Sequence, residues 1–180
     1  MNANFDPFPA LTTERLVLRK IKHSDVNEVF FLRSDKEVLK HLSTPPVQTN
    51  EEAEMWINKV INLEKKNESI NWALTLKNDD TLIGSICLWN LDNATDKGEV
   101  GYSMHPRHHG KGLMNEAMIA ILDYGFNTMK LSIVEAITNE NNTPSRNLLE
   151  RNNFTRDALL EKQRLGTEEP WTAVIYTIRK

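Results

Sequence analysis

The stretch Gly98-Glu-Val-Gly-Tyr-Ser-Met-His-Pro-Arg107-His-His-Gly110-Lys-Gly112-Leu-Met-Asn-Glu-Ala117 decides how the rest of this chain is interpreted. It predicts a short strand, a basic turn with two glycines, and the start of an amphipathic helix. Glycine lets the backbone approach an anion closely, and a helix N-terminus has unpaired N–H groups and the positive end of the helix dipole. The turn Arg107–Gly112 therefore predicts a site for a phosphate or diphosphate group.

The composition limits the class of protein. The chain has 180 residues, 39% of them hydrophobic, and a formal net charge of −3. This predicts one globular domain over residues 1–180, with a core from about 11 to 178 after a polar lead-in over 1–10. The acidic balance argues against a nucleic-acid-coating protein, and no apolar run reaches the roughly 18 residues of a membrane span. We expect no nucleic-acid or membrane partner.

The single cysteine, Cys87, excludes an intrachain disulfide. The N-terminus lacks the basic start and apolar run of a signal peptide. Both observations fit a cytoplasmic location, which we expect.

The hydrophobic period changes along the chain between 3.6 and 2, which predicts an α+β fold. Alternation predicts strands at residues 14–21, 72–76, 82–89, 99–104, 131–137, 154–164 and 171–178. Helical spacing predicts helices after Ser24, at 35–42, 49–66 and 112–128, and from Thr143 as N-cap to about 152. Asn90–Lys97 is expected to be a loop, and Asn153 a left-handed helix end. The unit from 99 to 137 is strand–helix–strand, so its two strands should pair in parallel.

The chain resembles a known family. Arg107-x-x-Gly110-x-Gly112, between a strand and a helix, is similar to the acyl-CoA signature of the GNAT N-acetyltransferases. Leu11-Thr-Thr-Glu-Arg-Leu-Val-Leu-Arg19 resembles the opening of the ribosomal-protein N-terminal (alanine/serine) acetyltransferase subgroup. Glu99–Met104, and Asn142-Thr-Pro-Ser145 through Asn153-Phe154, resemble its later landmarks.

The resemblance covers nearly the whole chain and implies both fold and cofactor. The implied fold is a mixed α/β GNAT architecture. Its mostly antiparallel, seven-stranded twisted sheet is splayed between strands 4 and 5 and flanked by about four helices. Acetyl-CoA is the implied co-substrate and lies in the gap, with no metal. The expected cofactor-binding residues are Met104, His105, Arg107, His109, Gly110, Lys111, Gly112, Leu113, Met114, Asn142 and Ser145.

These residues have expected roles. The diphosphate takes N–H groups from His109 to Met114, and backbone N–H near Met104 polarises the thioester carbonyl. Asn142 contacts the pantetheine arm. Leu149 stands where many family members carry a tyrosine acid, while Ser145 matches a serine of the subgroup. The resemblance therefore implies a hydrogen bond or a proton from Ser145 to the CoA sulfur.

Acetyl transfer to an amine also needs a way to remove a proton. A free α-amine has a pKa of about 8 and a lysine amine about 10, so much of either is protonated at neutral pH. A carboxylate on the cleft strand can take that proton, directly or through water, and Glu99 is the candidate base.

Structural interpretations compete with these roles. Glu99 could be a solvated surface carboxylate, and Ser145 could simply cap the backbone of its helix. His105, His108 and His109 could bind a metal only by converging with a further ligand, so we favour a basic rim for phosphate.

The leading function is an N-acetyltransferase that moves an acetyl group from acetyl-CoA to a primary amine by direct attack. The subgroup points to the N-terminal amine of a protein, including a ribosomal one. The alternatives are a small amine (a polyamine, an amino-acid derivative or an aminoglycoside) and a non-catalytic acyl-CoA-binding module. His41–Thr49 and Asn90–Lys97 are expected to flank the acceptor cleft. We expect a monomer or a homodimer.

Overall fold

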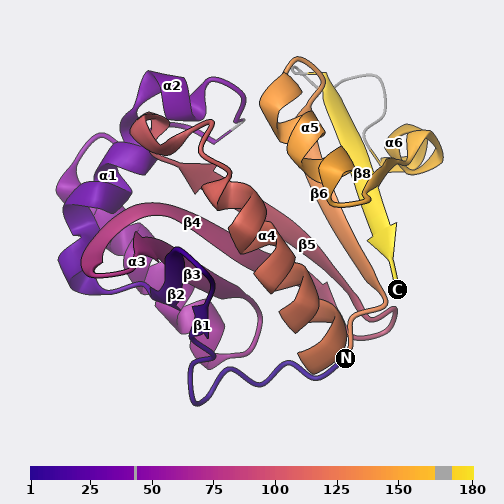
Figure 1. Cartoon of the computed structure of the whole chain (residues 1–180), viewed down its shortest axis with the longest axis horizontal. Helices are drawn as coiled ribbons and strands as arrows, with labels where there is room; N and C mark the ends of the chain where they lie inside the picture. Colours follow the sequence, from indigo (N-terminus) through magenta and orange to yellow (C-terminus); the bar gives the residue numbers. More distant parts are fainter. Residues whose placement is uncertain (43, 165–171) are drawn as a thin grey trace.

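One mixed sheet carries the fold, with the strand order β1-β2-β3-β4-β5-β6-β8-β7 (Figure 1). The computed structural model describes residues 1–42, 44–164 and 172–180. Within these residues the strands are β1 (Leu11–Thr12), β2 (Leu16–Lys20), β3 (Ile70–Leu76), β4 (Asp79–Asp92), β5 (Lys97–Met104), β6 (Ile133–Asn139), β7 (Thr155–Arg156) and β8 (Ala173–Arg179). All neighbouring strands pair antiparallel except β5 and β6.

Six α-helices lie in the described part of the chain. They are α1 (Val26–Ser34), α2 (Lys36–Leu39), α3 (Asn50–Lys65), α4 (Leu113–Asp123), α5 (Thr143–Arg151) and α6 (Ala158–Arg164). Short 3-10 turns at His23–Asp25 and Pro106–His108 precede α1 and α4, and a π-helical turn at Tyr124–Thr128 extends α4.

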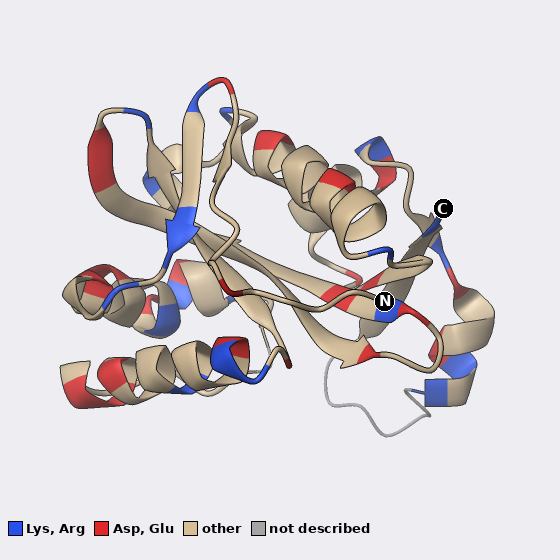
Figure 2. Ribbon diagram, turned by 90° about the horizontal axis from the view of Figure 1, so that it is seen from below, with Lys and Arg blue, Asp and Glu red and all other residues tan. Residues whose placement is uncertain are grey.

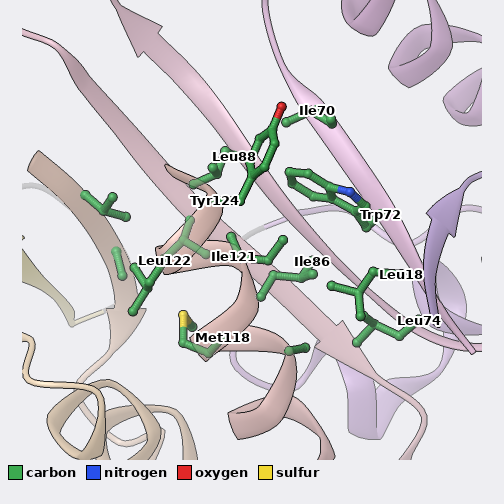
Figure 3. Close-up of a cluster of buried hydrophobic side chains, with 14 of the residues drawn as sticks. Leu18, Ile70, Trp72, Leu74, Ile86, Leu88, Met118, Ile121, Leu122 and Tyr124 are labelled. Carbon is green, nitrogen blue, oxygen red and sulfur yellow. The ribbon is translucent and has the colours of Figure 1, made fainter. Parts of the chain in front are cut away.

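Helices cover both faces of the sheet, as the view from below shows (Figure 2). On one face, α1 and α3 bury their apolar sides against Ala73 and Leu82. On the other face, α4 lies over the strands and meets Trp72, Ile86 and Leu88 in the larger core (Figure 3). Because side chains alternate along a strand, the same strands supply both cores.

The predicted parallel pairing is confirmed, and it is short. The ladder between β5 and β6 joins Lys97 to Ile133, Gly98 to Val134 and Glu99 to Glu135. β5 continues to Met104 and β6 continues to Asn139. A ladder that stops while both strands continue is what the predicted splay requires. The extent of the splay stays a prediction.

The predicted count of seven strands and about four helices is too low. The two-residue strand β1 was not predicted. The predicted strand at 154–164 is wrong: only Thr155 and Arg156 pair, and α6 follows. Asp157 starts that helix, since its carboxylate accepts the N–H of Leu160 at 2.9 Å. The residues of α6 are good helix formers, which outweigh their weak alternation.

Several predicted boundaries shift. Ser24 lies inside a 3-10 turn, and Asn142 rather than Thr143 is the N-cap of α5. The predicted loop at 90–97 shrinks, because β4 extends to Asp92 and β5 begins at Lys97. The last predicted strand is β8; Trp171 and the linker at 166–170 lie outside the described residues.

The N-terminal segment packs on the core although it was predicted as a polar lead-in. Phe5 is buried, and Pro9 C=O accepts the indole N–H of Trp72 at 2.8 Å. Asn153 does adopt the predicted left-handed conformation, with φ 63°.

Helix α4 offers a matched test of the larger core. Ile121 is fully buried, whereas Ile119 on the same helix is 56% exposed. We expect Ile121→Ala to lower the free energy of unfolding by about 2–5 kcal/mol through lost burial and a cavity. Ile119→Ala should change it by less than about 0.5 kcal/mol. Denaturant unfolding measures both, and equal effects would contradict this account of the core.

Candidate active site

The turn after β5 has the backbone of an anion site. Gly110 and Gly112 have φ values of 71° and 75°, the left-handed region that favours glycine. A Cβ on Gly110 would meet nothing within 4 Å, so the space beside it is open. Gly112 is the N-cap of α4 and delivers the chain into that helix.

Backbone N–H groups at this helix start are available to an anion. The first N–H groups of a helix have no intrahelical acceptor, which leaves those of Leu113 and Met114 free for a ligand. The side chain of Leu113 is buried, so only its backbone can serve. The backbone N–H of His109 was also expected to bind the diphosphate. That expectation is wrong, because this N–H already donates to Pro106 C=O at 3.0 Å.

The basic side chains of the turn differ in their surroundings. Arg107 and Lys111 are exposed. His105 stacks on Phe31 with ring centroids 4.2 Å apart, and its Nδ1 accepts the N–H of Arg107. Partial burial, followed by the nearby charge of Lys111, lowers the pKa of His108. The described residues contain no group of three or more His, Cys, Asp or Glu side chains arranged for a metal ion.

Met104 directs a backbone N–H into the region between β5 and β6. Alternate residues of an antiparallel strand point their N–H and C=O groups to the same neighbour. His105 points to β4, since its N–H donates to Ile83 C=O at 2.8 Å. Met104 must therefore point the other way, where the β5–β6 ladder has already ended. Its C=O lies 2.8 Å from His109 Nε2.

Ser145 lies at the centre of a hydroxyl cluster on the α4 and α5 side of the sheet. Its Oγ lies 2.7 Å from the phenol oxygen of Tyr102 and accepts Thr138 Oγ1–H at 3.0 Å. Asn142 caps α5 by accepting the Ser145 N–H at 3.2 Å, which leaves its amide NH₂ for another partner. Ser145 is therefore not the cap of its helix, and its hydroxyl faces β5.

Tyr102 places a phenol beside Ser145, one helical turn before Leu149, whose side chain has no hydroxyl group. Burial raises the pKa of Tyr102 to about 12. A phenol of that pKa stays protonated at neutral pH and is a hydrogen-bond donor. It is a weaker acid than a CoA thiol of about 8.5, so it suits stabilisation of a thiolate better than full protonation of it.

Glu99 lies on the opposite face of β5 from Tyr102, because the two residues are three positions apart along the strand. The Glu99 side chain is buried, and this burial raises its pKa, against a hydrogen bond from Asn90 that lowers it. Its neighbour across the parallel ladder is Glu135, which is also buried. Lys97 Nζ lies 3.3 Å from Glu135, and Arg164 forms a second ion pair with it.

The structure thus gathers the predicted residues into two groups. The turn, Met104, Asn142 and Ser145 lie toward α4 and α5, and Glu99 lies on the other face. The sequence reasoning missed Tyr102, Thr138 and Glu135. For Tyr102 a signal existed: it shares a strand face with Met104 and lies within the quoted motif.

Comparisons with known proteins identify the family of this chain. The model of the acetyltransferase (GNAT) domain matches residues 15–155. The chain belongs to the GNAT acetyltransferase family. The N-acetyltransferase p20 of Bacillus licheniformis is 32% identical over 150 residues, which cover 83% of this chain and 84% of p20.

Two further similarities concern one solved structure and one relative that covers part of the chain. A ribosomal L7/L12 α-N-protein acetyltransferase in complex with coenzyme A superposes with a TM-score of 0.81 at 16% identity, covering 95% of this chain and 98% of that one. A Bacillus subtilis protein named "Putative ribosomal N-acetyltransferase YdaF" is 33% identical over 79 residues, or 44% of this chain and 43% of YdaF.

This GNAT protein is an acetyl-CoA-dependent N-acetyltransferase. Its turn fits the co-substrate, because the left-handed glycines and free N–H groups leave room for a diphosphate. Among the described residues, no helix is both long and apolar enough to cross a membrane.

Gly112 tests the placement of the diphosphate. Gly112→Val forces a β-branched residue into a left-handed conformation and adds a side chain at the helix start. We expect the Kd for acetyl-CoA to rise at least about tenfold, measured by calorimetry, with the thermal midpoint recorded alongside.

Gly112→Asn is the matched control, because asparagine tolerates this conformation. An equal loss in both variants indicates steric exclusion of the anion, and a loss in the valine variant alone indicates backbone strain. Unchanged affinity in the folded valine variant would remove the diphosphate from this turn.

Proposed function

We propose that this enzyme acetylates the N-terminal amine of a protein by direct attack, with Glu99 as general base. The observation that carries the proposal is that the Glu99 carboxylate and the Ser145 hydroxyl cluster lie on opposite faces of β5. The proton acceptor lies on one face and the Ser145 cluster on the other, beside the point where the β5–β6 ladder ends. An amine and a thioester can then meet from opposite sides of the sheet.

Acetyl-CoA supplies the activated acetyl group as a thioester. Glu99 takes a proton from the amine, directly or through one water. Burial favours its neutral form, so each proton it accepts is held more firmly than by an exposed carboxylate. Its ionised form must be populated for this role, which sets a lower pH limit on the reaction.

The other face stabilises the charges that develop. The Met104 N–H is positioned to donate to a carbonyl oxygen at the opening of the ladder. Ser145 and Tyr102 form a hydroxyl pair, 2.7 Å apart, that can donate to a departing sulfur. Thr138 donates to Ser145, and one proton of the Ser145–Tyr102 pair is used between the two hydroxyls, so the pair has one proton left to donate to the sulfur.

The surroundings of Glu99 support a chain end as acceptor. A cavity of about 260 Å³ is lined by Lys97, Glu135 and residues of α6, so it borders the ladder neighbour of Glu99 and not Glu99 itself. It is small beside typical pockets of about 300–1,000 Å³, which suits a terminal residue of a longer chain. Trp89, the antiparallel partner of Glu99, is 45% exposed and offers an aromatic wall on the same face. The partial similarity to YdaF supports the same acceptor class.

Glu99→Gln tests the base. Because burial raises the pKa of Glu99, the wild-type kcat should fall as pH drops through a value above that of an ordinary glutamate. The variant should lose that acid limb and about 10²-fold in kcat near neutral pH. Its deficit should shrink above the pKa of the acceptor amine, where no base is needed. A pH–rate profile identical in shape to wild type would exclude Glu99.

An acceptor panel tests the acceptor class. The panel compares peptides with free α-amines, the same peptides with blocked N-termini and an internal lysine, polyamines, amino-acid derivatives and an aminoglycoside. CoA release is followed with a thiol reagent. We expect the highest kcat/KM for free α-amines and little turnover of blocked peptides. Preference for a small amine would overturn the protein acceptor while leaving the acetyl-CoA chemistry in place.

A further inference from the structure

Arg15, in the turn between β1 and β2, reaches the anion-binding turn from a distant part of the chain. Its NH1 donates to the C=O of Lys111 at 2.9 Å, and its Nε donates to Glu116 Oε2 at 2.7 Å. Nearly half of the Arg15 side chain, 46%, is exposed. The guanidinium therefore lies at the surface with its orientation set by two contacts.

Glu116, in the first turn of α4, holds Arg15 in place. One carboxylate oxygen accepts the backbone N–H of Arg15 at 2.7 Å and also contacts the Thr13 hydroxyl, while the other takes Arg15 Nε. Although partial burial opposes it, these hydrogen bonds lower the pKa of Glu116, so the carboxylate stays ionised at neutral pH. The orientation of the Arg15 guanidinium group is thereby set before any ligand binds.

The remaining nitrogen of the fork faces the glycine turn. Arg15 NH2 lies 3.5 Å from the position that a Cβ on Gly112 would occupy. Among the described residues it has no hydrogen-bond acceptor, whereas Nε and NH1 each have one. An oriented guanidinium with a free donor beside left-handed glycines and helix N–H groups matches the chemistry of phosphate recognition.

We propose that Arg15 binds a phosphate group of the acyl-CoA together with the N–H groups of the turn. Its contact with Lys111 adds a positioning role, because it holds that carbonyl oxygen on the guanidinium and away from the anion. The phosphate can belong to the diphosphate or to the 3′-phosphate of the adenosine, and the ligand chemistry is the same. The proposal depends on the use of acetyl-CoA and not on the acceptor.

A purely structural ion pair predicts a different outcome. An exposed salt bridge contributes little to stability, about 0–1 kcal/mol, and its loss leaves cofactor binding nearly unchanged. Loss of a phosphate contact weakens binding of the cofactor specifically. The two interpretations therefore separate in a binding experiment.

The experiment measures the Kd of CoA and of 3′-dephospho-CoA by calorimetry for wild type, Arg15→Gln and Arg15→Lys. Arg151→Gln, which removes one exposed arginine at the end of α5, controls for the loss of a positive charge. We expect Arg15→Gln to raise the Kd of CoA about tenfold and Arg15→Lys to recover part of the loss, with Arg151→Gln near wild type.

The two ligands distinguish the source of the phosphate. An equal loss for CoA and 3′-dephospho-CoA assigns the diphosphate, and a loss for CoA alone assigns the 3′-phosphate. A change in Arg15→Gln no larger than that in Arg151→Gln would overturn the proposal. Thermal midpoints check folding, and if Arg15→Gln does not fold, the same comparison is made with Arg15→Lys, where unchanged affinity for both ligands overturns it.

Discussion

Parallel pairing between β5 and β6 stops at Glu99 and Glu135 while both strands continue, and the candidate site depends on this interruption. Beyond it, backbone groups that a ladder would satisfy point into the region between the strands. Met104 is one of them, because its neighbour His105 is already paired with β4. A buried backbone donor without an acceptor is costly unless a ligand uses it, and the proposed oxyanion site uses this one.

The alternation of side chains makes β5 a partition between two chemistries. Tyr102 turns toward α5, where Ser145 and Thr138 complete a chain of hydroxyl groups. Glu99 turns to the other face and lies beside a second buried carboxylate. In the proposed mechanism the base and the sulfur-binding hydroxyl groups lie on opposite faces of β5, so they do not form a hydrogen bond with each other. They also give the acceptor and the co-substrate separate approaches.

The position of the anion-binding turn depends on how α4 packs in the core. Helix α4 buries Ile121 and Met118 against the sheet, and this packing holds its first turn at the end of β5. The two glycines supply conformations that other residues adopt at a cost, and Arg15 ties the turn to the N-terminal strands. The proposed cofactor site thus combines the turn and helix α4 with a distant segment that meets them only in the fold.

The sequence by itself determined the local features of this protein. The spacing of residues within short segments predicts the basic glycine turn, the helix behind it, the strand that carries Glu99 and the parallel direction of β5 and β6. The local pattern predicted a strand at 154–164, and this prediction is wrong. The Asp157 cap and the helix-forming residues after it favour helix α6 instead.

Only the tertiary structure decided which distant groups meet. Tyr102 and Ser145 are 43 residues apart in the chain, and Arg15 and Lys111 are 96 apart. Nothing in the spacing of either pair predicts contact, because such contacts follow from strand order and from the register of each ladder. Those are properties of the whole packed sheet, and they determine which side chains come together in the candidate site.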